Sequence, residues 1–140
     1  MSDSPSSPSY GQICWFEVPV TDVSRAATFY STVLGWECNN LEGTPSPSGR
    51  EKSVHMFSKG ALNGAFLLMK DDAMVAKFDD SKKAVPVATF LVSSIDETTK
   101  KIEAAGGQVN LPRTEIGGGM GFFARFIDTE GNLHGIWAKE

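Results

Sequence analysis

Hydrophobic positions along the chain recur first with the spacing of a strand and then with the spacing of a helix, and this succession occurs twice. Residues 15–20 alternate as in a strand, and residues 23–34 then place apolar side chains on one face of a helix. The same order returns at residues 87–92 and 95–105. The two apolar faces consist of Val23, Ala26, Ala27, Tyr30, Val33 and Leu34, and of Ile95, Thr98, Thr99, Ile102 and Ala105.

Polar residues precede each predicted helix, and glycine follows it. Thr21-Asp22 and Ser93-Ser94 can accept hydrogen bonds from the free N–H groups of a first turn. Gly35 and Gly106-Gly107 can adopt the left-handed conformation that ends a helix. Strands are predicted before and after the helices, at 13–20, 36–41, 53–59 and 62–69, and again at 86–93, 108–113, 121–127 and 133–138.

Two short stretches support an internal duplication. "GALNGAF" (60–66) and "GNLHGIW" (131–137) have nearly the same composition in the same order. The offset from Trp15 to Val87 exceeds that from Gly64 to Gly135 by one residue. We therefore predict an α+β fold of two tandem βαβββ units, with unit one at 12–70, a polar linker at 71–85 and unit two at 86–138.

Composition is that of one globular domain. The chain has 140 residues, of which 41% are hydrophobic and 21% charged. The Ser/Pro-rich residues 1–11 are predicted to form a disordered tail, and 12–138 to form the domain. A net charge of −4, without a long basic or apolar run, argues against nucleic acid and membranes as partners. Cys14 and Cys38 lack metal or redox spacing, which favours reduced thiols in a cytoplasmic protein.

Three phrases resemble the vicinal oxygen chelate superfamily, the group of glyoxalase I, bleomycin-resistance proteins and extradiol dioxygenases. They are "FEVPVTDVSRAATFYSTVLGW", "IEAAGGQV" and "FIDTEGNLHGIW", with Thr129 where proline is usual. The resemblance covers residues 12–138 and is strongest to the glyoxalase-related branch. It implies that the units form a curled mixed sheet around a concave substrate pocket, with the helices on the outer face.

The resemblance also implies metal ligands in the first and last strand of each unit. Those positions fall on Trp15, Gly64, Val87 and Gly135, whose side chains cannot bind a metal. A shift of one residue in the first unit would offer only Asn63 or Ala65. We therefore expect no metal and no other cofactor. Glycines at these places would let a bulky ligand approach the backbone.

One carboxylate is predicted to lie inside the pocket. If Trp15 faces the concave side, alternation places Glu17 there too. A carboxylate among apolar neighbours must pair with a cation, protonate or reach water. Arg125 in "FFARFID" is the predicted partner, because Ala124 and Phe126 read as helix-facing core. Glu17 is then either a general base or ligand anchor with Arg125 as counter-ion, or half of a structural pair across the sheet.

The other site candidates are weaker. His55 is a third catalytic candidate whose face is ambiguous, whereas His134 is predicted to be a packed core histidine. The "GGGMG" stretch (117–121) reads as a loop or as a flap over the pocket mouth. The predicted substrate-binding set, which core packing would also explain residue by residue, is Trp15, Gly64, Leu67, Met69, Val87, Leu91, Gly135 and Trp137.

Three functions remain open at this point. The first is a metal-independent lyase or isomerase that binds a small apolar or aromatic carbonyl compound and uses Glu17 as base. The second is a non-catalytic, resistance-type binding protein, for which the resemblance implies a homodimer. The third is a divergent metal-dependent glyoxalase or dioxygenase with unexpected ligands such as His55 or Glu17. Fold resemblance alone does not choose among them.

Overall fold

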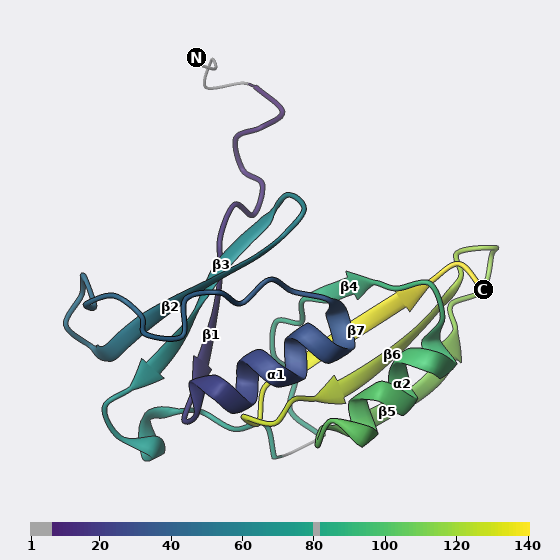
Figure 1. Cartoon of the computed structure of the whole chain (residues 1–140). Helices are drawn as coiled ribbons and strands as arrows, with labels where there is room; N and C mark the ends of the chain where they lie inside the picture. Colours follow the sequence, from purple (N-terminus) through teal and green to yellow (C-terminus); the bar gives the residue numbers. More distant parts are fainter. Residues whose placement is uncertain (1–6, 80–81) are drawn as a thin grey trace.

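The computed structural model describes residues 7–79 and 82–140 and confirms an α+β fold of two similar units (Figure 1). Of the expected tail, residues 1–6 lie outside the described residues, and Tyr10 donates its N–H to Ser7 O in a turn. Among the helices of the described part, none is long and apolar enough to cross a membrane. The elements are β1 (Phe16–Val20), α1 (Val23–Leu34), β2 (Glu51–Lys59), β3 (Leu62–Met69), the 3-10 helix η1 (Asp72–Met74), β4 (Thr89–Leu91), α2 (Ile95–Ala104), β5 (Gln108–Glu115), β6 (Phe122–Ile127) and β7 (Leu133–Ala138).

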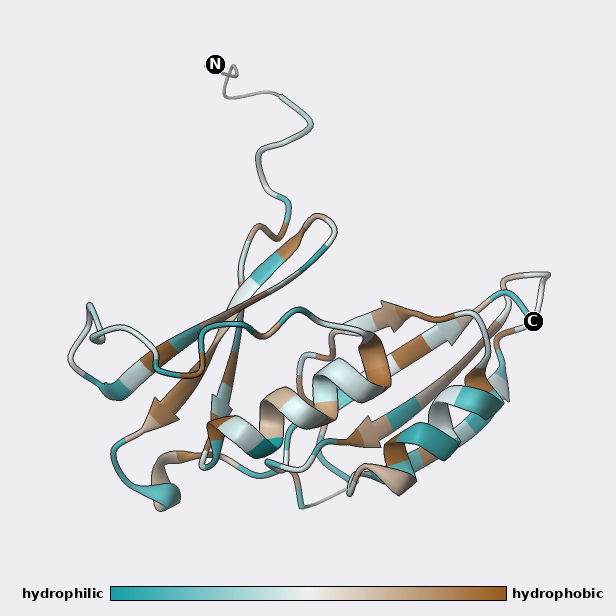
Figure 2. Ribbon diagram, viewed as in Figure 1, coloured by the Kyte–Doolittle hydropathy of each residue, from teal (hydrophilic) through white to brown (hydrophobic). Residues whose placement is uncertain are grey.

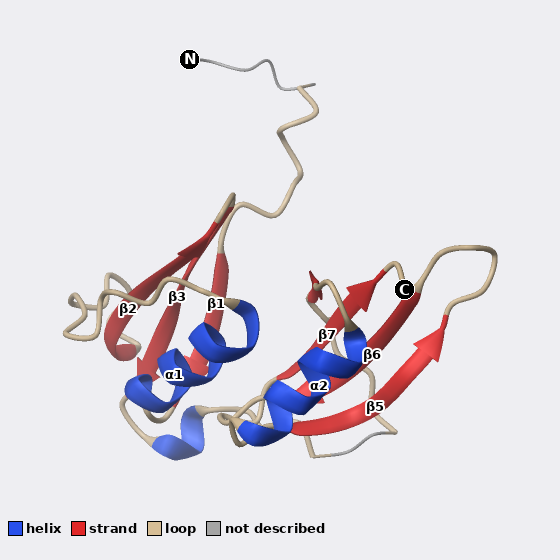
Figure 3. Cartoon of the chain, turned by 45° about the vertical axis from the view of Figure 1, so that its right-hand side comes forward, coloured by secondary structure: helices blue, strands red, loops and turns tan. Residues whose placement is uncertain are grey.

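The strands form two separate sheets instead of one curled sheet. The first has the order β1-β3-β2 and the second the order β4-β7-β6-β5. In each sheet the first strand of the unit pairs in parallel with the last, and the remaining pairs are antiparallel. Figure 3 shows α1 over the first sheet and α2 over the second. The repeated pairing pattern supports the duplication that the sequence predicts.

The predicted strand at 36–41 is wrong. Only single bridges remain near it, between Glu37 and Ser58 and between Thr44 and Val54. Trp36 is 3% exposed, and its ring stacks at 4.2 Å on Tyr30 and at 4.3 Å on Phe57, measured between centroids. The stack holds the start of this segment in the core, and the segment does not pair as a strand along its length. The first unit therefore has three strands. The first strands of the units are also shorter than expected.

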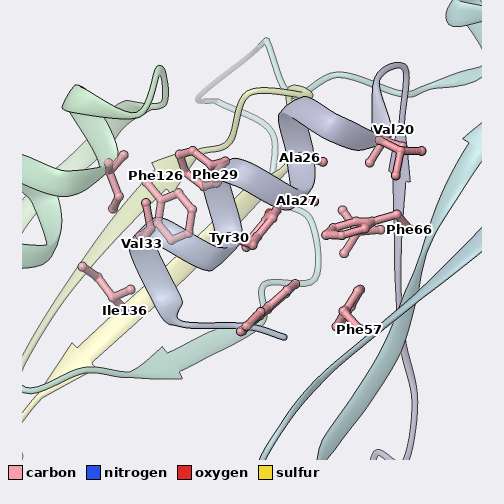
Figure 4. Close-up of a cluster of buried hydrophobic side chains, with 14 of the residues drawn as sticks. Val20, Ala26, Ala27, Phe29, Tyr30, Val33, Phe57, Phe66, Phe126 and Ile136 are labelled. Atoms are coloured by element: carbon pink, nitrogen blue, oxygen red, sulfur yellow. The ribbon is translucent and has the colours of Figure 1, made fainter. Parts of the chain in front are cut away.

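The core lies on both sides of α1. Figure 4 shows side chains of the first sheet on one side of this helix and side chains of the second sheet on the other. In Figure 2 the strands carry both brown and teal stretches, and α2 is teal along much of its length. One continuous core therefore joins the two units, and its buried members include Val20, Ala26, Phe29, Tyr30, Phe57, Phe66, Phe126 and Ile136.

A carboxylate of the second unit binds the start of α1. Glu130 is 1% exposed and accepts the backbone N–H groups of Thr21 and Asp22 at 2.9 and 3.1 Å. Its other oxygen accepts Nε of Arg25 at 2.7 Å. Burial acts to raise the pKa of Glu130, but the hydrogen bonds, that from Arg25 foremost, outweigh it and hold the pKa below its ordinary value. The positive end of the α1 dipole favours the same charge.

A second buried carboxylate organises the loop between β6 and β7. Asp128 accepts the N–H groups of Glu130 and Asn132, both at 2.8 Å, and also the hydroxyl of Tyr30. Burial, and then the charge of Asp128, raises the pKa of that hydroxyl. Asn132 donates Nδ2 to Pro19 O at 3.1 Å. The loop of unit two is therefore bound to both α1 and β1 of unit one.

Replacing Glu130 with Ala should destabilise the protein strongly. The change leaves the helix N–H groups and Arg25 without their acceptor, and we expect the free energy of unfolding to fall by about 3 kcal/mol. Urea denaturation followed by circular dichroism measures the loss. Glu103→Ala, at an exposed position of α2, is the matched control and should change stability by less than about 0.5 kcal/mol. Equal effects of the two changes would contradict this role of Glu130.

Candidate functional site

The face of the first sheet that points away from α1 is graded from polar to apolar. Successive residues of a strand point to opposite faces, so every second residue of β1, β3 and β2 contributes to this face. The register aligns these residues in rows across the sheet. Beginning beside Trp15, which immediately precedes β1, the rows are Asn63 with Ser58, then Glu17 with Ala65 and Met56, then Pro19 with Leu67 and Val54.

A hollow of about 340 Å³ lies over the apolar end of this face. The loop between α1 and β2 lines it through Thr44, Pro47, Ser48 and Arg50, and Glu51 at the start of β2 lies beside them. We call it the Glu17 hollow. Its lining includes Trp15, Glu17, Arg50, Glu51, Val54, Met56 and Leu67. It combines an apolar floor with two carboxylates and one guanidinium, as small-molecule sites commonly do.

Glu17 presents an accessible carboxylate to this hollow. It is exposed, and Nε1 of Trp15 donates to its Oε2 over a long 3.4 Å. Its neighbour across the register, Ala65, is buried beneath the surrounding side chains. Among the described residues no cation pairs with Glu17. The carboxylate therefore reaches water and remains free to accept a proton or a hydrogen bond.

Glu51 is a pocket residue that the sequence analysis missed. It is 6% exposed and accepts hydrogen bonds from Ser46, from Ser48 at 2.8 Å and from Arg50 at 3.2 Å. The hydrogen bonds from the two serines, that from Ser46 first, lower the pKa of Glu51 to about 2. A bulge between Glu51 and Ser53 shifts the strand register here. Simple alternation therefore could not place this side chain. The sequence signal for it is the pair of serines, Ser46 and Ser48, shortly before β2.

The predicted pair of Glu17 and Arg125 is not formed. Alternation assigned the face of Arg125 correctly, because Ala124 and Phe126 are 1% exposed in the core. Arg125, however, lies on β6 of the second sheet, whereas Glu17 lies on β1 of the first sheet. Its guanidinium lies 5.6 Å from the ring centroid of Phe123. The two residues therefore occupy separate sheets within one chain.

His55 lies on the opposite face of the sheet from Glu17. It pairs in register with Phe66 of the core and is 4% exposed. Its Nδ1 donates to Asn40 O at 2.9 Å, since a carbonyl can only accept, and its Nε2 lies 2.7 Å from Ser53 Oγ. A Cβ at Gly43 would lie 2.5 Å from the imidazole. His55 therefore holds the turn after α1 and stands outside the Glu17 hollow.

Neither of the two predicted glycine positions has room for a side chain, although Gly64 lines a second hollow beside the Glu17 hollow. Gly64 pairs with Phe16 on the helix side, where a Cβ would lie 1.9 Å from Phe16 O and 2.7 Å from Phe57 Cζ. The expected inward direction of Gly64 is thus corrected by the strand register. At Gly135, a Cβ would lie 2.7 Å from Thr89 Oγ1. Close packing of the chain itself accounts for both glycines.

The remaining predicted lining residues divide between the two sheets. Leu67 and Met69 share the face of Glu17. Leu91 and Trp137 belong to the second sheet, and Val87 lies just before its strand β4. Leu91 is 77% exposed. Trp137 donates Nε1 to Met120 O at 2.8 Å, which fastens the glycine-rich loop to the second sheet. The structure thus brings Trp15, Glu17, Leu67 and Met69 to one face, and it keeps the second-sheet set apart from them.

The residues present do not fit the divalent metal centre that the resemblance implied. Within 7–79 and 82–140, no group of three or more His, Cys, Asp and Glu side chains is arranged to hold a metal ion. Both nitrogens of His55 are engaged, and the Glu51 carboxylate is already occupied by hydroxyl and guanidinium donors. Glu17 is left as a single available oxygen ligand in the hollow.

His134 packs in the core, as predicted. It is 6% exposed and lies among the rings of Phe16, Phe90 and Phe126, with centroids 5.4 to 5.8 Å away. Neither ring nitrogen has a hydrogen-bond partner in the described part of the chain. Burial, offset in part by the charge of Asp128, lowers the pKa of His134 to about 4.

Comparison with known proteins identifies relatives over nearly the whole chain. The family model described as the Glyoxalase/Bleomycin resistance protein/Dioxygenase superfamily matches residues 12–136. A glyoxylase-like domain-containing protein of Didymella fabae is 28% identical over 130 residues, which cover 93% of this chain and 95% of that protein. The anthracycline biosynthesis protein DauV of Streptomyces sp. strain C5 is 26% identical over 135 residues, covering 92% of this chain and 47% of DauV. The chain thus spans about half the length of that bacterial relative.

Solved structures share the fold at low sequence identity. The fosfomycin resistance protein FosX of Listeria monocytogenes superposes with a TM-score of 0.65 at 18% identity, over 91% of this chain and 92% of FosX. A hypothetical protein of Staphylococcus aureus, SA1046, gives a TM-score of 0.63 at 18% identity, over 92% of this chain and 98% of that one. At this identity the likeness concerns the fold alone.

His134 should make the protein sensitive to mild acid. Between pH 6.5 and about 4 the unfolded chain takes up a proton at this residue that the folded chain excludes. The free energy of unfolding should therefore fall, by about 3 kcal/mol over the window, as the pH is lowered. His134→Phe, which suits the aromatic surroundings, should remove this contribution. Urea denaturation of both proteins at pH 7 and pH 5 measures the difference, and identical pH dependence of the two would rule out the assignment.

Proposed function

Because the chain belongs to the Glyoxalase/Bleomycin resistance protein/Dioxygenase superfamily, we propose that it binds a small apolar or aromatic carbonyl compound in the Glu17 hollow and catalyses proton transfer at carbon. The observation that carries the proposal is the accessible carboxylate of Glu17 above an apolar floor. No cation of the described chain neutralises it, and Trp15 stands beside it. A base, an aromatic wall and an apolar floor are what such a substrate requires.

The proposed chemistry needs one base and one group that receives charge. Glu17 takes a proton from the carbon next to the carbonyl, and the electron pair of the broken C–H bond moves onto the carbonyl oxygen. Arg50, whose side chain is 68% exposed at the rim, can donate to that oxygen. Return of the proton to another carbon gives an isomerase, and loss of a leaving group gives a lyase.

A non-catalytic binding function is the second candidate. It is favoured by the occupied state of Glu51, whose partners Ser46, Ser48 and Arg50 leave Glu17 as the one free carboxylate of the hollow. A hollow with a single proton acceptor can hold a ligand without completing a reaction. FosX, a structural neighbour, is by its name a resistance protein. The metal-dependent alternative lacks a donor set among the described residues.

We further propose that two copies of the chain associate through the face of the second sheet that points away from α2. Leu91, a large apolar side chain, is 77% exposed there. DauV is about twice as long as this chain, so two copies of the chain together would have about the length of one DauV protein.

Replacing Glu17 with Gln should abolish proton transfer while leaving the fold intact. The probe is 4-phenyl-2-butanone in D₂O, in which NMR follows exchange of the protons beside the carbonyl. We expect the wild-type protein to accelerate exchange and Glu17→Gln to be slower by about 100-fold or more, which is the usual contribution of a general base. The melting temperature should not change, because the Glu17 side chain is exposed.

Two comparisons sharpen that experiment. Glu115→Gln, at an exposed position of β5, should exchange at the wild-type rate, and dialysis against a chelator should leave the rate unchanged. Binding of the ketone without exchange would favour the non-catalytic function. Loss of the fold in Glu17→Gln would instead assign Glu17 a structural role and remove the proposal.

Leu91→Asp should separate the proposed pair of chains. Light scattering after gel filtration should give twice the chain mass of 15.1 kDa for the wild type and a single chain for the variant, because a charge would be buried in the interface. Leu41→Asp is the matched control, since Leu41 is 54% exposed in the loop after α1. A wild-type chain that is monomeric at high concentration would refute the pairing.

A further inference from the structure

A second hollow of about 340 Å³ adjoins the Glu17 hollow and shares Trp15 and Met56 with it. It lies over the polar end of the same sheet face, where Asn63 pairs with Ser58. The segment that follows α1 closes its other side. We call it the amide hollow, and its polar lining consists of Glu37, Asn39, Asn40, Ser58 and Asn63.

The polar groups of the amide hollow are free for a ligand. In the described part of the chain, the side chains of Asn39, Asn63 and Ser58 have no hydrogen-bond or ion-pair partner. Asn40 uses its Oδ1 to accept the N–H of Gly43 at 3.2 Å, which leaves its NH₂ group available. Glu37 is fixed through its backbone, which exchanges hydrogen bonds of 2.8 and 3.0 Å with Ser58. The hollow thus offers both donors and acceptors on a fixed frame.

This set of groups selects a neutral, hydroxyl-bearing partner. The residues that line the amide hollow include no Lys or Arg, so a phosphate or carboxylate would find no counter-ion and would be repelled by Glu37. A hydroxyl group both donates and accepts. It can therefore donate to the Glu37 carboxylate or to an amide oxygen while it accepts from an amide NH₂ group.

We propose that the ligand of this protein has two parts, an apolar aromatic carbonyl body in the Glu17 hollow and a neutral polyhydroxylated ring, such as a glycosyl group, in the amide hollow. The inference rests on the proposed use of the Glu17 hollow and extends it. Trp15 stands between the hollows with 42% of its surface exposed. Because Trp15 lines both hollows, its indole can pack against the aromatic body beside the junction of the two parts.

The register of the sheet fixes the direction and the length of such a ligand. The polar row of Asn63 and the apolar row of Leu67 lie on one strand, β3, with Ala65 between them. Residues two apart on a strand are separated by roughly 7 Å, so the three rows span roughly 13 Å. Two linked six-membered rings fit this length, with the polar ring toward the turn between β2 and β3.

Calorimetric titration with 4-hydroxyacetophenone and with its β-D-glucoside tests the inference. We expect the glucoside to bind about 10-fold more tightly than the free phenol. Asn63→Ala should remove most of this advantage while it leaves the affinity for 4-hydroxyacetophenone unchanged. Asn63 is exposed, so the variant should fold, and circular dichroism checks that it does. Asn110→Ala, at an exposed position of β5, should bind both compounds as the wild type does.

The outcomes separate this inference from the function on which it rests. If 4-hydroxyacetophenone binds and its glucoside binds no better, the two-part ligand is refuted and the use of the Glu17 hollow stands. If the glucoside binds better but Asn63→Ala changes nothing, the amide hollow is not the site of the sugar and the inference fails. If neither compound binds, the proposed ligand class fails and the inference fails with it.

Discussion

The contact between Glu130 and the first turn of α1 is the constraint on which the rest of the structure depends. Neither unit satisfies its own polar groups here, because the carboxylate belongs to unit two and the N–H groups belong to unit one. Asp128 and Asn132 extend the connection to Tyr30 and Pro19. The acidic residues of "FIDTEGNLHGIW" therefore serve architecture, and they fix how the two sheets lie on either side of α1. The Glu17 hollow lies on the face of the first sheet that points away from α1.

Local signals in the sequence were sufficient for both helices, for the strands other than the one predicted at 36–41, and for the face of Glu17. Asp22 and Gly35 cap α1 where the sequence places them, and alternation puts Trp15 and Glu17 side by side. The failures have non-local causes. The absence of a strand at 36–41 depends on the stack of Trp36 with Tyr30 and Phe57, and the placement of Glu51 depends on a bulge. Strand periodicity contains none of this information. The separation of Glu17 from Arg125 is likewise a matter of how two sheets pack.

Two carboxylates in one hollow illustrate how surroundings assign roles to identical groups. Glu51 is saturated by serine and arginine donors, and it stabilises the wall of the hollow as a permanent anion. Glu17 has a single long contact with Trp15 and faces the solvent. A ligand can therefore compete for Glu17 without dismantling the wall. The gradient from amides to aliphatic side chains along β3 then orients whatever binds.

The close contact between Gly43 and His55 has a consequence for how this protein can evolve. Gly43 has a φ of 79°, and any side chain there would strike an imidazole held on both of its nitrogens. The turn would have to move, and with it Asn39 and Asn40, which line the amide hollow. A single substitution at a residue that lines neither hollow would then change the outline of both. Selection for new ligands therefore has a route through this turn that spares Glu17, Trp15 and the floor beneath them.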